Sequence, residues 1–134
     1  MKIAQTPEPE QFKELMEGPA DSPVVMLNLL SFEENADGAN AGLTGAESYM
    51  KYAAKMQEFV ESKGGRFLYS GRVDSMVIGE SDAPFQVAAL VEYPNRQAFV
   101  EIASSAHVAD IGKDRKDGLA GQWLVATTQT AGIL

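Results

Sequence analysis

The sequence predicts a single α+β domain of the ferredoxin-like β-α-β-β-α-β type, with a four-stranded antiparallel sheet and an extra N-terminal helix. Strand-like and helix-like hydrophobic periods follow one another in that order along the chain. The length of 134 residues is that of one ordinary domain. Helices cover only one sheet face in this plan, so the other face needs a cover, and we expect a second copy of the chain to provide it.

The first half of the chain carries clear local signals. Thr6-Pro7-Glu8 predicts a helix over about 7–17, because a hydroxyl cap precedes proline at the first helical position. The apolar run 24–30 predicts the first strand. The glycine-rich segment 33–45 predicts a long mobile loop, a candidate lid. Thr44-Gly45-Ala46-Glu47 has the form of a capping box and predicts the start of the longest helix, which Gly64-Gly65 ends.

The second half repeats this alternation. The remaining strands are expected at 66–79, with a bend at Gly71, at 86–93 and at 122–128. Asn95 predicts the cap of one helix, and Ser104-Ser105 predicts the start of a second one that ends near Lys116. The barrel subunit would then occupy about residues 22–128 of a single domain, 1–134.

Composition excludes several classes of function. The net charge of −8 and the lack of a basic run argue against nucleic acid and anionic membranes as partners. The absence of cysteine removes disulfides and thiolate chemistry. No signal peptide or spanning segment is evident, so we expect a cytoplasmic protein. No metal-ligand or nucleotide-binding pattern is present, and we expect no metal and no cofactor.

Strand alternation divides the side chains of the predicted sheet into two sets. The first set is almost wholly apolar and is expected to pack on the helices; it comprises Val25, Leu27, Leu29, Phe67, Tyr69, Val87, Ala89, Val91, Trp123 and Val125. The second set mixes aliphatic residues with five polar ones, namely Asn28, Ser70, Arg72, Glu92 and Gln122. We expect this second face to line a cavity beneath the partner's sheet.

Arg72 and Glu92 are the main catalytic candidates. A hairpin that turns symmetrically about Asp82 would place them opposite each other as a charge-assisted pair. Arg72 would then polarise a carboxylate or enolate, with Glu92 orienting it or acting as a base. The alternative is a structural ion pair that holds the hairpin and the dimer together.

The other candidates each have two interpretations. Asn28, within an apolar strand, is either a satisfied structural amide or a ligand contact, together with Ser70 and Gln122. Tyr49 and Tyr52 either pack in the core with their hydroxyls at its edge or contact a substrate. His107, the single histidine, is a candidate general base or simply a surface or capping residue.

Several stretches resemble the domain of unknown function 1330 family of the dimeric α/β-barrel superfamily. They are Val25-Met26-Leu27-Asn28-Leu29-Leu30, Gly64-Gly65-Arg66, Ser70-Gly71-Arg72-Val73, Ala89-Leu90-Val91-Glu92-Tyr93-Pro94 and Gly118-Leu119-Ala120-Gly121-Gln122-Trp123-Leu124. The resemblance implies a ferredoxin-like subunit and a homodimer formed sheet against sheet. The superfamily includes cofactor-free monooxygenases, isomerases, stress-response proteins and haem-binding enzymes. Two functions therefore stay open: a cofactor-independent enzyme acting on a small acidic or phenolic molecule, or a non-catalytic ligand-binding or stress-response module whose polar face only sets dimer register.

Overall fold

The structure is a computed structural model that describes residues 2–132. Its strands are β1 (Val24–Phe32), β2 (Arg66–Arg72), β3 (Val87–Tyr93) and β4 (Leu119–Thr127). Its α-helices are α1 (Pro9–Met16), α2 (Gly45–Ser62), α3 (Arg96–Ala103) and α4 (Ala106–Gly118), with a short 3-10 helix, η1 (Gly38–Asn40).

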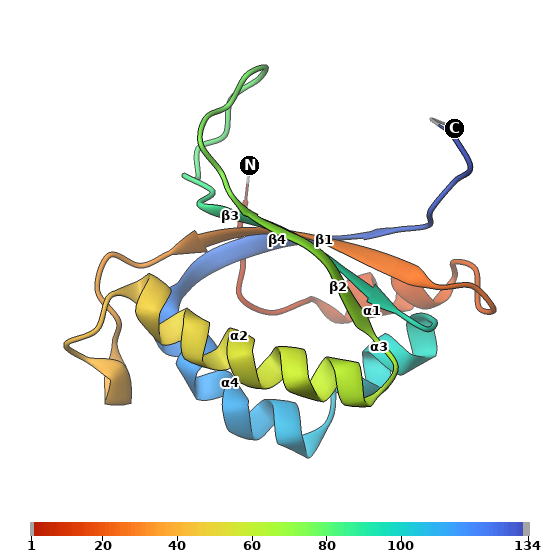
Figure 1. Cartoon of the computed structure of the whole chain (residues 1–134), viewed down its shortest axis with the longest axis horizontal. Helices are drawn as coiled ribbons and strands as arrows, with labels where there is room; N and C mark the ends of the chain where they lie inside the picture. The colour runs from red at the N-terminus through yellow and green to blue at the C-terminus, as the bar shows by residue number, and fades with distance from the viewer. Residues whose placement is uncertain (1, 133–134) are drawn as a thin grey trace.

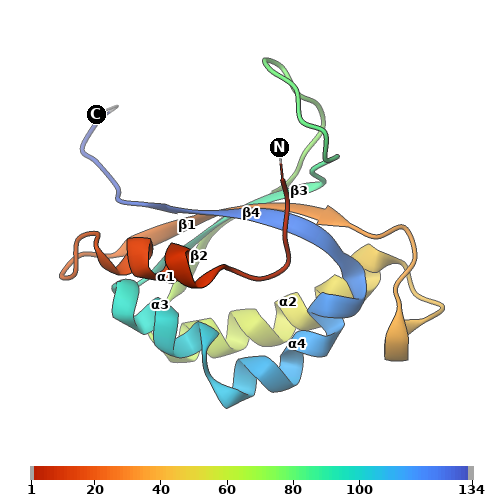
Figure 2. The same ribbon diagram turned by 180° about the vertical axis from the view of Figure 1, so that it is seen from behind.

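The four strands form one antiparallel sheet in the order β2-β3-β1-β4. Helices α2, α3 and α4 lie against one face of this sheet, and α1 lies beside α3 (Figures 1 and 2). The opposite face, here named the open face, carries no helix (Figure 1). The predicted ferredoxin-like fold and the extra N-terminal helix are confirmed.

The core lies between the sheet and the helices. Val24, Met26, Val91 and Tyr93 are buried in one cluster with residues of α2 and α3. Because side chains alternate along a strand, their immediate neighbours in sequence belong to the open face. Cross-strand partners share a face, so the open face comprises Val25, Leu27, Leu29, Arg66, Tyr69, Gly71, Ala88, Leu90, Glu92, Trp123, Val125 and Thr127.

The predicted division into two faces was wrong for β1 and β4. Asn28 pairs with Ala89 and Met26 with Val91, so an even-numbered residue on β1 shares a face with an odd-numbered one on β3. A bulge between Phe67 and Tyr69 shifts the register of β2 as well. Four of the five polar residues share the helix-facing side of the sheet, and the fifth, Glu92, lies on the open face. The four are Asn28, Ser70, Arg72 and Gln122.

The capping signals were mostly confirmed. Thr44 forms the predicted capping box with Glu47, and Asn95 and Ser105 accept hydrogen bonds at the starts of α3 and α4. The first helix differs, because Glu8 rather than Thr6 is the cap, in a box with Gln11.

Segment 33–45 was predicted to be a long mobile loop, but contacts anchor it to the rest of the chain. Ala36 and Asn40 are buried. The backbone amides of Glu33 and Asp37 donate to carbonyls of Gly118 and Asp117 at distances of 2.9 and 3.0 Å. The segment is therefore fixed against the end of α4.

Candidate functional site

A chain of polar side chains runs from α4 to β1 between the helices and the sheet. The Arg115 guanidinium Nη2 donates to Gln122 Oε1 at 2.8 Å. Gln122 Nε2 donates in turn to Asn28 Oδ1 at 3.4 Å, and Asn28 Nδ2 donates to the carbonyl of Met26 at 3.2 Å. All three polar side chains are half-buried. The chain thus carries one positive charge into the space under the sheet.

Aromatic rings line the same region. The rings of Phe32 and Tyr49 have centroids 5.2 Å apart, and those of Tyr49 and Tyr52 are 5.4 Å apart. Burial raises the pKa of both tyrosine hydroxyls, while the charge of Arg115 acts in the opposite direction on each. The tyrosines are therefore protonated donors at neutral pH, close to a guanidinium. Together with the polar chain they form the cluster that we name the Arg115 cluster: Asn28, Phe32, Tyr49, Tyr52, Arg115 and Gln122.

Arg72 and Glu92 do not meet, so the predicted pair was wrong. Arg72 lies opposite Val87 and Glu92 lies opposite Arg66, because the β2–β3 connection is not centred on Asp82 and β2 contains the bulge. Arg72 is 87% exposed and lies 3.5 Å from Asp74. Glu92 Oε1 instead accepts from Arg66 Nη2 at 2.9 Å on the open face.

Ser70 and His107 lie apart from the Arg115 cluster. Ser70 is on the helix-facing side of the edge strand β2 but is exposed. His107 is exposed at the start of α4, where its ring packs on Phe59 with centroids 4.4 Å apart. The structure therefore brings together Asn28, Gln122, Tyr49 and Tyr52, but not the three catalytic candidates.

Arg115 is the residue that sequence reasoning missed. The run Lys113-Asp114-Arg115-Lys116-Asp117 has the composition of a solvated helix end. A helical period counted from the buried Ile111 would have placed positions 114, 115 and 118 on the inner side. The three- and four-residue spacing from Ile111 was thus the signal in the sequence that could have predicted Arg115 on the inner side of the helix.

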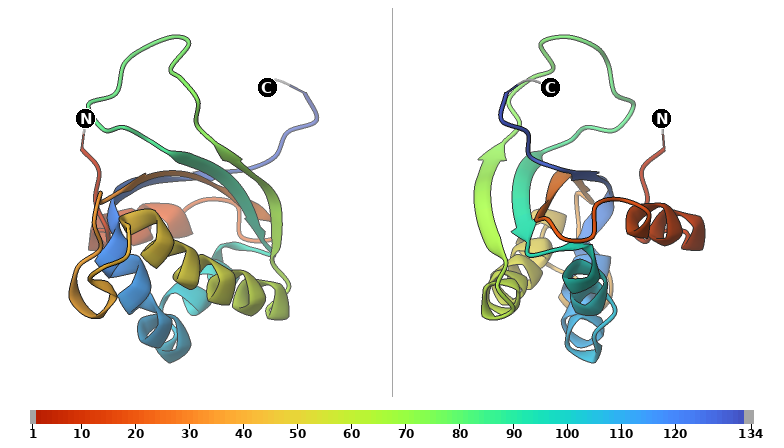
Figure 3. Two further views of the ribbon diagram at one scale, coloured as in Figure 1. Left: turned by 60° about the vertical axis from the view of Figure 1, so that its left-hand side comes forward. Right: turned by 90° about the vertical axis from the view of Figure 1, so that its right-hand side faces the viewer.

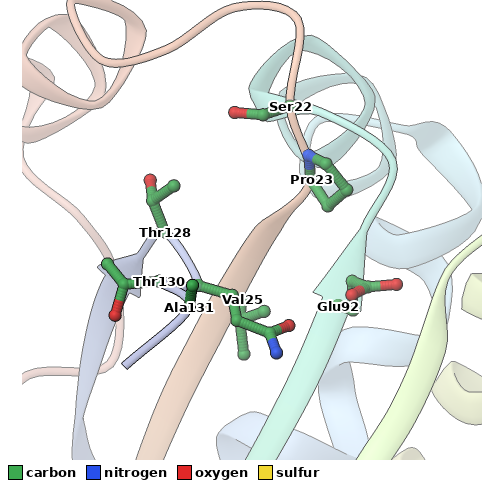
Figure 4. Close-up of a pocket in the computed structure, with 8 residues that line it drawn as sticks. Ser22, Pro23, Val25, Glu92, Thr128, Thr130 and Ala131 are labelled. Atoms are coloured by element: carbon green, nitrogen blue, oxygen red, sulfur yellow. The ribbon is translucent and has the colours of Figure 1, made fainter. Parts of the chain in front are cut away.

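Two hollows open on the surface. One of about 350 Å³ lies over the open face at the Val25 end of β1, between Pro23, Glu92 and the segment 128–131 (Figure 4). The other, of about 500 Å³, lies beside Phe32 at the start of α2 and is also lined by Glu33, Thr44 and Gln86. The second hollow adjoins the aromatic wall of the Arg115 cluster.

Two further properties concern residues 2–132. No group of three or more His, Cys, Asp or Glu side chains within them is placed to hold a metal ion. No helix in that range has the length and apolar character needed to cross a membrane.

The sheet topology and the helices on one of its faces define the chain as a ferredoxin-like α+β protein whose other sheet face is open (Figure 1). The profile of the domain of unknown function 1330 (DUF1330) matches residues 38–128, and the chain belongs to this family. No curated protein sequence matches it.

Solved structures share the fold. A protein of unknown function from Rhodopseudomonas palustris has a TM-score of 0.87 at 25% identity, over 98% of this chain and 100% of that one. SnoaB, a cofactor-independent oxygenase from Streptomyces nogalater, has a TM-score of 0.56 at 12% identity, over 84% and 97%. A dabb family protein with a ferredoxin-like fold from Mesorhizobium loti has a TM-score of 0.54 at 9% identity, over 81% and 98%.

Proposed function

We propose that the protein is a homodimer in which each subunit binds a small aromatic or phenolic acid at the Arg115 cluster. The observation that carries this proposal is the state of Arg115 itself. Its guanidinium is half-buried and donates to a neutral amide. No carboxylate of residues 2–132 lies within 4 Å of it. A partly desolvated cation without a counter-ion favours an anionic ligand.

The neighbours of Arg115 support the chemistry of that ligand. The hydroxyls of Tyr49 and Tyr52 stay protonated at neutral pH, so they can donate to a carboxylate or phenolate oxygen. The ring of Phe32 adds an apolar wall suited to an aromatic group. A few convergent polar groups in an otherwise apolar lining are typical of ligand sites.

The open face supports a second copy as the partner. Its central side chains are Leu27, Leu29, Leu90, Val125 and Trp123, an apolar set that is unfavourable in water. An isologous contact buries this surface on both copies at once. Of the polar residues predicted for this interface, Asn28 and Gln122 lie inside the subunit and only Glu92 is on the open face, so the proposed dimer contact is more apolar than the sequence indicated.

Catalysis is the second candidate, and the fold shared with SnoaB is what favours it. Removal of a proton needs a base within hydrogen-bonding reach of the ligand. Glu92 lies on the opposite sheet face in a pair with Arg66, and His107 lies at the start of α4, apart from the Arg115 cluster, with its ring on Phe59. Binding without turnover is therefore the better supported function, and catalytic roles for Arg72, Glu92 and His107 remain proposals.

The test is a thermal-melting screen with benzoate, salicylate, catechol and hexanoate. A probe at 100 times its Kd stabilises the folded state by about 2.7 kcal/mol, which raises the melting temperature by several degrees. We expect benzoate or salicylate to do so in the wild type and Arg115→Gln to lose at least tenfold in affinity. Arg72→Gln is the matched control, because it removes an exposed guanidinium and should keep the full shift.

The outcomes separate the candidates. Arg115→Lys keeps the charge but not the planar fork, and we expect it to bind with intermediate affinity. Full binding by Arg115→Gln, with its circular dichroism unchanged, would refute the assignment of the site. Mass spectrometry of the same mixtures detects turnover. Consumption of a probe by the wild type but not by Arg72→Gln, Glu92→Gln or His107→Ala would establish that the protein is an enzyme.

A further inference from the structure

The connection between β2 and β3 is a long projection with an apolar tip, and we name residues 73–86 the arm. Val77 and Ile78 are 89% and 90% exposed, and Met76 beside them is 55% exposed. Three adjacent large apolar side chains at such exposure are unusual on a protein surface. Such an exposed apolar tip is typical of a surface that contacts another molecule.

The base of the arm is fixed, so its direction is determined. The Val73 amide donates to the Gln86 carbonyl at 2.9 Å, and the Gln86 amide donates to the Leu30 carbonyl at 2.7 Å. The ring of Phe85 packs on Trp123 of the open face with centroids 4.9 Å apart. The arm rises from the same side of the sheet as the open face and leads away from its own subunit (Figures 1 and 3).

The opposite end of the open face carries the 350 Å³ hollow. Val25, Glu92 and the segment 128–131 line it (Figure 4), and the C-terminal segment rises there on the same side as the arm (Figure 1). A cavity of roughly 150 Å³ holds a benzene molecule, so this hollow has room for two aliphatic side chains.

We propose that the tip of each arm, Val77 and Ile78, seats in this hollow of the partner subunit. The proposal rests on the homodimer proposed above. A twofold axis that lies between the two sheets and runs across the strands places the arm end of each copy over the hollow end of the other. Each limb of the arm has about six residues, or up to roughly 20 Å of extended chain, against about 10 Å between packed sheets. The arm is thus long enough for the contact.

Charge favours this pairing over an arm-to-arm pairing. The arm carries Asp74 and Glu80 and no basic residue, so two arms side by side would bring like charges together. The hollow is lined by Glu92, whose carboxylate accepts from Arg66 Nη2 at 2.9 Å, and by the uncharged segment 128–131, so it presents no unpaired acidic group. A second copy in the crossed arrangement therefore has room for the tip of the arm and avoids the contact between two acidic arms.

The test uses the absence of native cysteine. We expect the double variant Val77→Cys/Thr130→Cys to form a reducible covalent dimer under mild oxidation. Neither single variant should do so, and neither should the control pair Val77→Cys/Ser104→Cys, whose second cysteine lies between α3 and α4. A covalent dimer of Val77→Cys alone would indicate arm-to-arm packing, and a fast-migrating oxidised monomer would indicate an arm folded on its own subunit; either overturns the inference.

Light scattering on the uncrosslinked wild type separates this inference from the homodimer on which it rests. A monomeric wild type refutes both. A dimeric wild type whose double variant does not crosslink refutes the arm contact alone. We also expect Val77→Asp/Ile78→Asp to weaken dimerisation at least tenfold, and unchanged dimerisation would contradict the proposal.

Discussion

Asp114 is the buried charge that holds segment 33–45 to the helices. Only 4% of the residue is exposed. Its Oδ1 accepts from Asn40 Nδ2 at 2.8 Å, and its Oδ2 accepts from Lys55 Nζ at 3.3 Å. Lys51 Nζ donates to the amide oxygen of the same Asn40 at 2.8 Å. The network therefore satisfies a buried carboxylate with one buried amide and one cation from α2.

Removal of the carboxylate should cost more than removal of its cation. We expect Asp114→Ala to lower the free energy of unfolding by about 2 kcal/mol, because the buried amide of Asn40 loses its strongest acceptor. Lys55→Ala should cost under about 1 kcal/mol, since the lysine side chain is 53% exposed and its ion pair is screened by water. Urea denaturation of the two variants at pH 7 measures both values.

The same variants predict the direction of a pH dependence. The hydrogen bond from Asn40, with the charge of Lys55, holds the pKa of Asp114 below its usual range. Its contribution to stability is therefore complete above the ordinary aspartate pKa of about 4 and is lost as pH falls through the lower folded value. Asp114→Ala should show a flatter acid limb than the wild type, and equal slopes below pH 4 would contradict this.

The sequence predicted which single residues belong to a polar site better than it predicted which residues contact one another. Asn28, Gln122, Tyr49 and Tyr52 lie together on the helix-facing side of the sheet, whereas the sequence analysis placed Asn28 and Gln122 on the face toward the partner subunit. The predicted Arg72–Glu92 pair was wrong, because a bulge in β2 and a connection of 14 residues, 73–86, change the register between β2 and β3. No local pattern fixes how such strands align.

At the scale of elements, α2 and α4 cross at two glycines. A Cβ at Gly118 would collide with the carbonyl oxygen of Gly45 and would lie 2.9 Å from Ser48 Cβ. The Ser48 hydroxyl donates to the Asp114 carbonyl at 2.7 Å across the same contact. The helices can approach this closely only without side chains at the crossing.

Alanine at two glycines of α4 should have opposite effects. Gly118→Ala should destabilise the protein by about 1–3 kcal/mol through overpacking against backbone. Gly112→Ala is the matched control, because its Cβ would meet no atom within 4 Å and alanine favours a helix interior by up to about 1 kcal/mol. Thermal melting compares the two variants, and equal melting temperatures would contradict this view of the crossing.

Element boundaries followed from sequence where the signal is local. The capping residues Thr44, Asn95 and Ser105 satisfy amides within three positions of themselves, so the helix starts could be predicted. The anchoring of segment 33–45 could not, because its partners Asp114 and Asp117 are more than 70 positions away.

At the scale of the whole molecule, the register moves the candidate site. The sequence indicated a polar pocket between two subunits. The observed pairing instead puts Asn28 and Gln122 on the helix-facing side and leaves an open face that is apolar except at the Arg66–Glu92 pair. The dimer contact and the ligand site that we propose therefore use opposite faces of one sheet. We therefore expect variants of the open face to keep ligand binding and variants of the Arg115 cluster to keep the dimer.

The open face gives a prediction for assembly. Leu27 pairs with Leu90 and Val125 in the middle of this face. We expect Leu27→Asp to convert a dimer to a monomer, because it buries two charges at a twofold contact. Met50→Asp is the control, since Met50 is equally apolar but exposed on α2. Size-exclusion chromatography with light scattering decides; a dimeric Leu27→Asp variant would exclude the open face as the interface.

Binding at the Arg115 cluster is the central claim, and NMR titration with salicylate tests it most directly. The side-chain signals of Arg115 Nε–H and of the Asn28 and Gln122 amides report from the three polar members of the cluster. We predict saturable shifts of these signals in the wild type. In Arg115→Gln we predict that salicylate no longer shifts the side-chain amide signals of Asn28 and Gln122. Saturable shifts confined to other residues, or no shift of these signals at saturating salicylate or benzoate, would contradict the account.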